Sequence, residues 1–383
     1  MPRPSSSPPR TPAGADGARP DAGRARPDAG RAPKIGLVLS GGGARGFAHI
    51  GVLRVLERYG IEVDALAGTS MGAILAALYA NGYRADDLHE VASGVSWRDV
   101  IDLSLSGGVV KGEKLHQLLA TYLPPRFEDL GKTLAVTCTD IEAGEQLVFT
   151  SGDLITPLRA SACLPGAFEP VEYQGRTLAD GGILNNLPVD ALALAHTDLT
   201  LASDVSPPRR AVYTDLHGGQ DSWWQRVVAT VTLERRTPLA AATFRAADIM
   251  MRLLTDAQYI HHPADLRIQH EMPGYRLESF WALDEIVALG ETEAEDQLRA
   301  QPALLERLQA ASSAPLRRRP LPPAEAGAAW NARAPARAQD ASTSNPEARG
   351  DEGARPAGGA PASKPTERTG ETIRTLWSHL RRG

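Results

Sequence analysis

The sequence predicts an α/β fold, a mainly parallel sheet with helices on both faces. Short apolar runs alternate with helical patterns along the middle of the 383-residue chain, and such alternation is typical of parallel strands joined by helices. Two of the apolar runs end in glycine-rich turns, at 40–46 and 68–72, that lead directly into helical patterns. Turns of this kind gather at the carboxyl edge of a parallel sheet, where ligands usually bind.

Each element is predicted from its own pattern. Strands are expected at KIGLVLS (34–40), VDALAG (63–68), TLAVTCTD (133–140), EQLVFTSG (145–152), DLTLASDVS (198–206) and ADLRIQ (264–269). Helices are expected at 44–60, 71–83, 111–123, 188–196, 222–236, 244–260 and 281–310. The expected strands are short apolar runs, whereas the longer segments have helical periodicity.

The two ends of the chain differ in composition from the middle. Residues 1–32 and 312–383 are rich in Pro, Arg, Ala and Gly and poor in large apolar residues, so they cannot bury enough apolar surface to offset the entropy of ordering. We therefore expect a disordered basic arm at 1–32, one folded domain at 33–311 and a disordered basic tail at 312–383.

The last residues of the tail break this low-complexity pattern. Helical spacing relates four apolar residues, Ile373, Leu376, Trp377 and Leu380, and arginines surround them. A short helix at 371–382 would be apolar on one side and basic on the other, which suits an anionic membrane surface. Because so short a helix is marginal in water, a frayed tail end or a docking peptide for a protein stays open.

Charge is divided unevenly between these parts. The arm carries a net charge of +3 and the tail +5, and because the whole chain is −5 the middle carries about −13. An acidic domain is not expected to bind nucleic acid. The basic ends favour peripheral contact with an anionic membrane, although solvated linker charge accounts for them as well.

Cysteine usage and hydropathy point to the compartment. Only Cys138 and Cys163 are present, which supplies no disulfide framework and fits a reducing compartment. Residues 1–32 lack the apolar stretch of a signal peptide, and no run approaches the roughly 18 apolar residues of a membrane span. We expect a cytoplasmic protein, with peripheral contact at the inner membrane surface as a further expectation.

The first glycine-rich turn, LVLSGGGARGFAH, follows a strand and precedes a helix. Gly41, Gly43 and Gly46 satisfy the dinucleotide-binding spacing, and Asp64 falls near the position of a ribose-binding acid. Successive glycines also let backbone N–H groups converge beside a helix N-terminus, which stabilises a pyrophosphate or the oxyanion of an acyl transfer. The glycines alone leave both interpretations open.

The second turn, VDALAGTSMGA, places Ser70 between Gly68 and Gly72 at a strand-to-helix junction. A sharp turn there holds the serine in a strained conformation, and side chains two residues before or after it would collide. The two turns would lie side by side on neighbouring strands. This favours a nucleophilic serine at an elbow, facing an oxyanion loop, over a dinucleotide site.

The third motif, LADGGILNNLPVDAL, places Asp180 before a pair of glycines. Its carboxylate would sit on a tight turn at a strand end. A serine hydroxyl is a poor nucleophile until a base takes its proton, and an acid turned toward Ser70 would serve without a histidine.

In their order, the segments SGGGARG, GTSMG, SACLPGAFEPV and DGG resemble the patatin-like phospholipases, notably the bacterial branch, over nearly all of residues 34–300. The resemblance implies a patatin-like three-layer α/β/α fold. It also implies a Ser-Asp dyad in which Ser70 is the nucleophile and Asp180 the base, a mechanism that needs no metal or cofactor.

The same resemblance implies an oxyanion hole at the first turn. The backbone N–H groups of Gly41, Gly42 and Gly43 would form it. Arg45, in the family's basic position, would hold that loop or meet a phosphate.

The sequence therefore predicts a serine acyl hydrolase that cleaves lipid ester bonds, of phospholipase or lysophospholipase type. Two alternatives without hydrolysis are a catalytically inactive binding or scaffold protein with the same fold and a dinucleotide binder. A third is a Ser-His-Asp esterase, whose histidine would be one of four downstream of Asp180: His196, His261, His262 or His270.

Overall fold

The computed structural model describes residues 33–100, 112–165, 168–207, 238–312 and 318–322. The strands are β1 (Ile35–Leu39), β2 (Ala65–Thr69), β3 (Thr133–Asp140), β4 (Glu145–Phe149), β5 (Val171–Tyr173), β6 (Arg176–Asp180), β7 (Leu199–Asp204) and β8 (Leu266–Gln269). The expected arm at 1–32, the helix at 222–236 and the short helix at 371–382 lie outside the described residues.

Helices of two kinds connect the strands. The α-helices are α1 (Ala48–Arg58), α2 (Met71–Ala80), α3 (Ala85–Gly94), α4 (Trp97–Val100), α5 (Glu113–Tyr122), α6 (Ile155–Ser161), α8 (Pro238–His261), α9 (Leu283–Arg299) and α10 (Pro302–Ala311). The short 3-10 helices are η1 (Gly43–Phe47), η2 (Phe127–Asp129), η3 (Gly181–Ile183), η4 (Asp190–Ala195) and η5 (Phe280–Ala282).

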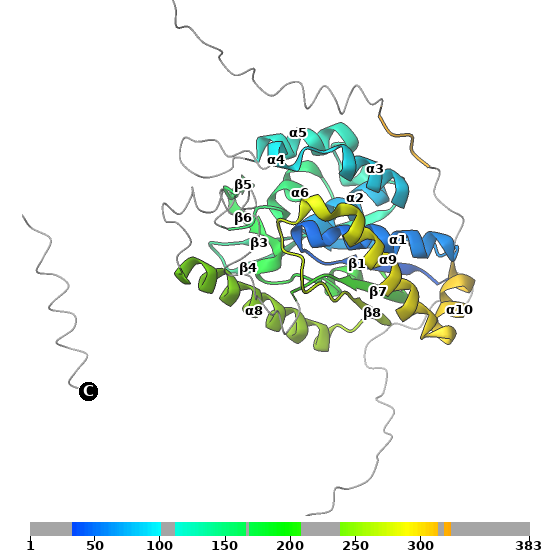
Figure 1. Ribbon diagram of the computed structural model, residues 1–383. Helices are drawn as coiled ribbons and strands as arrows, with labels where there is room; N and C mark the ends of the chain where they lie inside the picture. Colours follow the sequence, from blue (N-terminus) through cyan, green and yellow to red (C-terminus); the bar gives the residue numbers. More distant parts are fainter. Residues whose placement is uncertain (1–32, 101–111, 166–167, 208–237, 313–317, 323–383) are drawn as a thin grey trace, which may run out of the picture. The chain divides into compact units, whose positions relative to one another are not determined.

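The strands form one sheet in the order β5-β6-β3-β2-β1-β7-β8, and β4 pairs with β3 (Figure 1). The ladders that join β3, β2, β1, β7 and β8 are parallel, whereas those of β4, β5 and β6 are antiparallel. The mainly parallel sheet that the sequence predicts is confirmed.

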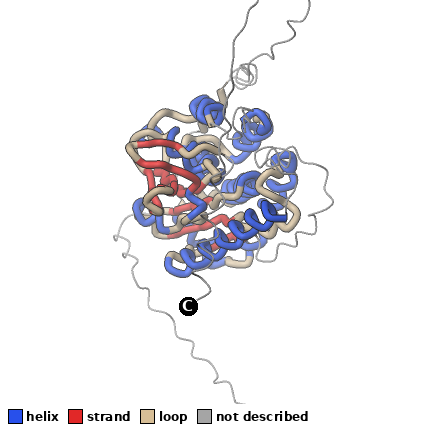
Figure 2. The backbone as a smooth tube through the Cα atoms, turned by 90° about the vertical axis from the view of Figure 1, so that its left-hand side faces the viewer, coloured by secondary structure: helices blue, strands red, loops and turns tan. Residues whose placement is uncertain are grey.

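Successive residues of β1 fill the two faces of the sheet. Leu37 and Leu39 belong to a large core shared with α1, α2 and α9, whereas Val38 belongs to a smaller core with residues of η4 and with Tyr259 from α8. Figure 2 shows most of the helices gathered on one side of the strands. A strand with both faces buried reads as a continuous apolar run, and the result is three layers with helices on both faces.

Helices α1 and α9 cross at close range on the face of the sheet that the large core covers (Figure 1). A Cβ atom on Gly290 would lie 2.2 Å from the carbonyl oxygen of Ala48, and one on Gly51 would lie 2.3 Å from that of Val287. Glycine at both positions lets the backbones meet. The crossing fixes α9 against the unit that β1 and α1 form.

Two segments differ from expectation. Residues 188–196, expected as an α-helix, form the six-residue 3-10 helix η4, which buries only Ala191 and Leu192. Helix α3 was not predicted, although its Leu88 and Ala92 are buried.

The described chain continues past the domain end expected at residue 311. Arg318 forms an ion pair with Asp87, the Arg319 guanidinium donates to the Asn81 side chain at 2.7 Å, and Leu321 packs against the large core. The folded region therefore extends to 318–322, because these arginines find acceptors on α3 and at the end of α2.

Candidate active site

Ser70 joins β2 to α2 in a strained backbone conformation. Its angles are φ 54° and ψ −127°, in the left-handed half of the map that a non-glycine residue occupies at a cost of about 1–3 kcal/mol. A Cβ atom on Gly68 would lie 2.7 Å from backbone atoms of Ala73, and one on Gly72 would lie 2.3 Å from the carbonyl oxygen of Leu39. Glycine is required on both sides, as the sequence predicts, and at Gly72 the collision is with β1.

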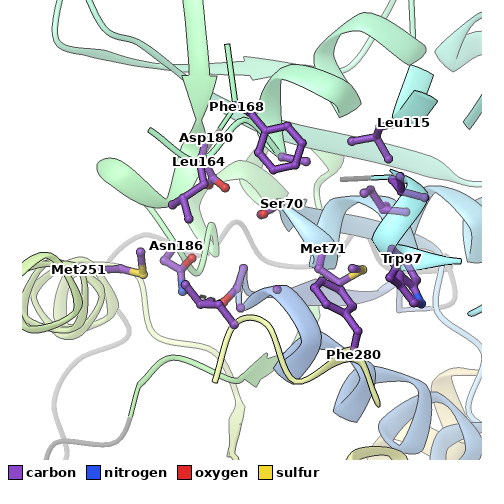
Figure 3. Close-up of a pocket in the computed structure, with 17 residues that line it drawn as sticks. Ser70, Met71, Trp97, Leu115, Leu164, Phe168, Asp180, Asn186, Met251 and Phe280 are labelled. Atoms are coloured by element: carbon purple, nitrogen blue, oxygen red, sulfur yellow. Dashed lines mark hydrogen bonds between the residues drawn. The ribbon is translucent and has the colours of Figure 1, made fainter. Parts of the chain in front are cut away.

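The sheet places Asp180 next to this turn. Thr69, the last residue of β2, pairs with Thr137 of β3, and Asp180, the last residue of β6, pairs with the following residue, Cys138. Strand β6 thus continues along the edge of β3 where β2 ends. Figure 3 shows the Ser70 hydroxyl pointing toward the Asp180 carboxyl.

The Asp180 carboxyl is buried and its pKa is raised. Burial disfavours the charged form and raises the pKa to about 6, while hydrogen bonds from the Gly182 N–H and the Ser70 hydroxyl lower it in part. The Gly182 N–H donates to the carboxylate at 2.7 Å. A carboxyl with this pKa is mostly ionised at pH 7 and still basic enough to take a proton.

The glycine-rich loop forms one wall beside the serine. The Gly41 N–H donates to the carbonyl oxygen of Asn186 at 3.1 Å, so that group is already used. Gly43 lies at φ 54°, and a Cβ atom there would lie 2.5 Å from the carbonyl oxygen of Leu277. The N–H groups of Gly42 and Gly43 are therefore the candidate oxyanion donors of the three glycines named from the sequence.

Asn186 connects the loop to the elbow, and it was not among the residues predicted from the sequence. Its side-chain amide donates to the carbonyl of Gly41 and to the hydroxyl of Ser206, both at 3.0 Å. The Thr69 hydroxyl donates to the carbonyl of Asn185 at 3.0 Å. The two asparagines of GGILNN thus tie both turns together, and the only signal for this was their position just after the Asp-Gly-Gly motif.

A pocket opens in front of Ser70, with a cavity of about 110 Å³. Its polar lining comes from Ser70, Asp180, Asn186 and the glycine loop, and its remaining wall is apolar, with Met71, Ile74, Trp97, Leu164, Phe168 and Phe280 (Figure 3). A second apolar cavity of about 30 Å³ shares Met71, Ile74 and Trp97 with the first and continues between α2, α3 and α5.

Arg45 lies behind the loop. Its side chain is buried in η1, and it does not line the pocket. Burial raises the pKa of the neighbouring Glu278 carboxyl, and the charge of Arg45 lowers that pKa in part. This position suits a residue that holds the loop.

The residues that a dinucleotide site or a Ser-His-Asp triad would need lie away from the pocket. The carboxylate of Asp64 accepts from the Ile35 N–H at 2.8 Å, at the start of β1, whereas the glycine loop follows the end of that strand, so Asp64 is at the wrong end of the sheet for a dinucleotide ribose. Of the four histidines considered for a triad, all within the described residues, none lines the pocket.

The described residues lack both a cluster of metal-ligating side chains and a helix able to span a membrane. These ranges hold no group of three or more His, Cys, Asp or Glu side chains placed to bind a metal ion. Within the same ranges, no helix combines the length and apolar character of a membrane span.

Known proteins resemble part of the chain. Residues 37–193 match the family model described as patatin-like phospholipase. An uncharacterized NTE family protein of Mycobacterium tuberculosis is 37% identical over 190 residues, which cover 47% of this chain and 52% of the relative. Lysophospholipase NTE1 of Pyricularia oryzae is 34% identical over 179 residues, 45% of this chain and 12% of the relative.

Solved structures resemble the chain more distantly. The crystal structure of VipD from Legionella pneumophila matches with a TM-score of 0.47 and 14% identity, over 70% of this chain and 67% of that one. The chain spans about half the length of the mycobacterial relative it matches. The matched segment, 37–193, holds the glycine loop, the serine elbow and the Asp-Gly-Gly turn, so the part of the chain that is similar to the patatin-like phospholipases contains all three motifs.

Proposed function

We propose that the protein is a serine acyl hydrolase that cleaves lipid ester bonds by a Ser-Asp dyad. One observation carries the proposal: Ser70, held on a strained elbow, faces the buried Asp180 carboxyl inside an apolar pocket. A serine within hydrogen-bond reach of a base is the arrangement by which nucleophilic catalysis activates a hydroxyl. The names of the family model and of the fungal relative support a lipid ester as substrate.

The chemistry needs only these groups. The Ser70 oxygen attacks the ester carbonyl carbon while its proton passes to the Asp180 carboxylate. The carbonyl oxygen becomes an anion, which the N–H groups of Gly42 and Gly43 stabilise. The bond to the alcohol then breaks, and the leaving oxygen takes the proton from Asp180.

Water completes the cycle. Asp180, again ionised, takes a proton from a water molecule that attacks the acyl-enzyme carbonyl. The bond to Ser70 breaks, its oxygen recovers the proton, and the fatty acid leaves. The apolar wall at Met71 and Ile74 accommodates the acyl chain beside the ester.

Hydrolysis of p-nitrophenyl esters and of a lysophospholipid by matched variants tests the proposal. Ser70→Ala should lower the rate by roughly a thousandfold or more, because the remaining groups do little without the nucleophile. Ser93→Ala, at an exposed serine of α3, is the control and should retain the wild-type rate. Ester hydrolysis that persists in Ser70→Ala would contradict the proposal.

A further inference from the structure

A chain of buried polar side chains runs from α9 to the strand that enters the glycine loop. The Glu293 carboxyl lies 2.8 Å from Nδ1 of His270, and Nε2 of His270 lies 3.0 Å from the Ser203 hydroxyl. That hydroxyl lies 2.7 Å from Nδ1 of His49, whose Nε2 lies 2.9 Å from the carbonyl oxygen of Ser40. The inner side chains are fully buried, whereas Glu293 is 24% exposed.

The number of protons in this chain is fixed by its ends. A backbone carbonyl closes one end and a carboxylate the other, and both only accept hydrogen bonds. Four hydrogen bonds need four protons, but Ser203 and two neutral imidazoles supply three. The complete chain therefore holds one proton more than its neutral groups carry.

The hydrogen-bond directions place this proton. Burial lowers the pKa of His49 to about 3, so His49 is neutral and donates from Nε2 to Ser40. Its Nδ1 then accepts from Ser203, and Ser203 accepts from Nε2 of His270. His270 must also donate from Nδ1 to Glu293, which makes it an imidazolium paired with a carboxylate.

The charged groups around the pair are themselves paired. Asp204, next to Ser203 on β7, accepts from Arg267 at 2.9 Å and lies 3.7 Å from the Arg252 guanidinium. The second oxygen of Glu293 accepts from the Glu271 N–H at 3.1 Å. Glu293 is thus the anion in direct hydrogen-bond contact with His270.

The Ser40 carbonyl is a junction between the two catalytic turns. Its peptide unit also carries the Gly41 N–H, which the carbonyl of Asn186 holds at 3.1 Å, so both ends of this planar unit are fixed. A Cβ atom on Gly72 would lie 2.5 Å from the Ser40 oxygen, so the elbow helix packs directly on it. A shift of this carbonyl would move the loop relative to Ser70.

We propose that His49 is a positioning residue for the oxyanion loop, and that the extra proton shared by His270 and Glu293 keeps it oriented. Within the proposed hydrolase, on which this inference rests, His49 acts through Ser40 and touches no substrate. Loss of the proton leaves three protons for four links. Because a bond to a carboxylate is stronger than one to a neutral carbonyl, the remaining protons turn toward Glu293 and the link from His49 to Ser40 is the one that breaks.

Nitrogen NMR of the full-length protein with ¹⁵N-labelled histidine tests the proton arrangement without any activity assay. At pH 7 His270 should carry protons on both ring nitrogens and His49 on Nε2 alone, with His49→Gln and His270→Gln providing the assignments. In Glu293→Gln the side-chain amide can donate to Nδ1, so His270 should become neutral. A neutral His270 in the wild type, or a proton on Nδ1 of His49, would overturn the inference.

Kinetics on a soluble ester test the positioning role. His49→Leu should lower kcat by about tenfold or more with KM nearly unchanged, because a displaced loop affects the transition state. His49→Gln keeps a donor near Ser40 and should recover most of the rate. Equal rates for wild type and His49→Leu, or no recovery in Gln, would contradict it.

The pH profile separates this role from a structural one and remains available if His49→Leu does not fold. In the wild type kcat should fall by about tenfold at alkaline pH as the extra proton leaves, whereas Glu293→Gln should hold its kcat there. Identical alkaline limbs in the two proteins would overturn the inference. If the wild type hydrolyses no ester, the proposed function fails, and the NMR result still decides the proton count.

Discussion

The backbone N–H of Ser70 donates to the Ser161 hydroxyl at 2.9 Å, and that hydroxyl donates onward to the carbonyl of Thr137 at 2.7 Å. Ser161 lies at the end of α6 and is completely buried. It therefore anchors the strained elbow to β3, the strand that also pairs with β6.

Removal of the Ser161 hydroxyl should loosen the elbow. Ser161→Ala leaves the Ser70 N–H and the Thr137 carbonyl without their buried partner, which should lower the free energy of unfolding by about 1–3 kcal/mol. We expect kcat for a soluble ester to fall by about tenfold because Ser70 is less well placed. Denaturant unfolding and ester kinetics, beside Ser93→Ala, check both effects, and an unchanged kcat would argue against the role.

The acid limb of the pH profile should report Asp180. The base must be ionised to take the Ser70 proton, and its pKa is raised to about 6 by burial. We expect kcat/KM to rise with pH and to level off above about pH 6, falling about tenfold per pH unit below it. Initial rates on a neutral soluble ester, measured over a series of pH values, check this. A fall in kcat/KM centred near pH 4 would show that another group controls the rate.

The raised pKa of Asp180 also predicts that the ionised carboxylate, the form needed as a base, lowers the stability of the folded protein. Asp180 binds its proton more tightly in the folded protein than in the unfolded chain. The bound proton therefore stabilises the folded state, and this stabilisation is fully present below pH 3.8 and is lost as pH rises through about 6. The difference corresponds to about 3 kcal/mol. Asp180→Asn should be inactive. Its free energy of unfolding relative to that of the wild type, measured by urea unfolding, should increase between pH 4.5 and pH 8. A difference between the two proteins that does not change with pH would contradict this.

Chain-length preference should depend on the shared wall of the two cavities. Ile74 lines both and is 8% exposed. Ile74→Trp adds bulk at the wall that the two cavities share, so kcat/KM for long-chain p-nitrophenyl esters should fall severalfold more than for the acetate. Ile141→Trp, at an exposed position, is the control. Equal losses on both esters would mean that acyl chains do not lie against this shared wall.

The sequence could predict what its local patterns determine. Gly68 and Gly72 framing Ser70 identify the elbow, since the collisions that require glycine arise from the adjacent turn and strand. The Asp-Gly-Gly motif predicted that Asp180 lies on a tight turn at a strand end, and the end of β6 before η3 confirms this position. Its assignment as the base depended on the other two motifs and on the family resemblance, so that role stays a prediction. The alternation of apolar runs and helices was enough to predict the parallel part of the sheet.

Other contacts could not be predicted, because their partners are distant in sequence. His49 lies in an ordinary helical pattern, and its partner Ser203 is 154 residues away. Arg318 resembles the rest of the basic tail, yet it pairs with Asp87 across 231 residues. Such contacts appear only once the sheet order and the crossing of α1 with α9 are known.

The most direct measurement of the central claim is covalent labelling with a fluorophosphonate probe, followed by peptide mass spectrometry. We expect one phosphonylated site on the folded full-length protein, at Ser70. We expect no label in Ser70→Ala and much slower labelling in Asp180→Asn, which lacks the base. Label on a different serine, or no label on a folded wild-type protein, would contradict the claim that Ser70 is an activated nucleophile.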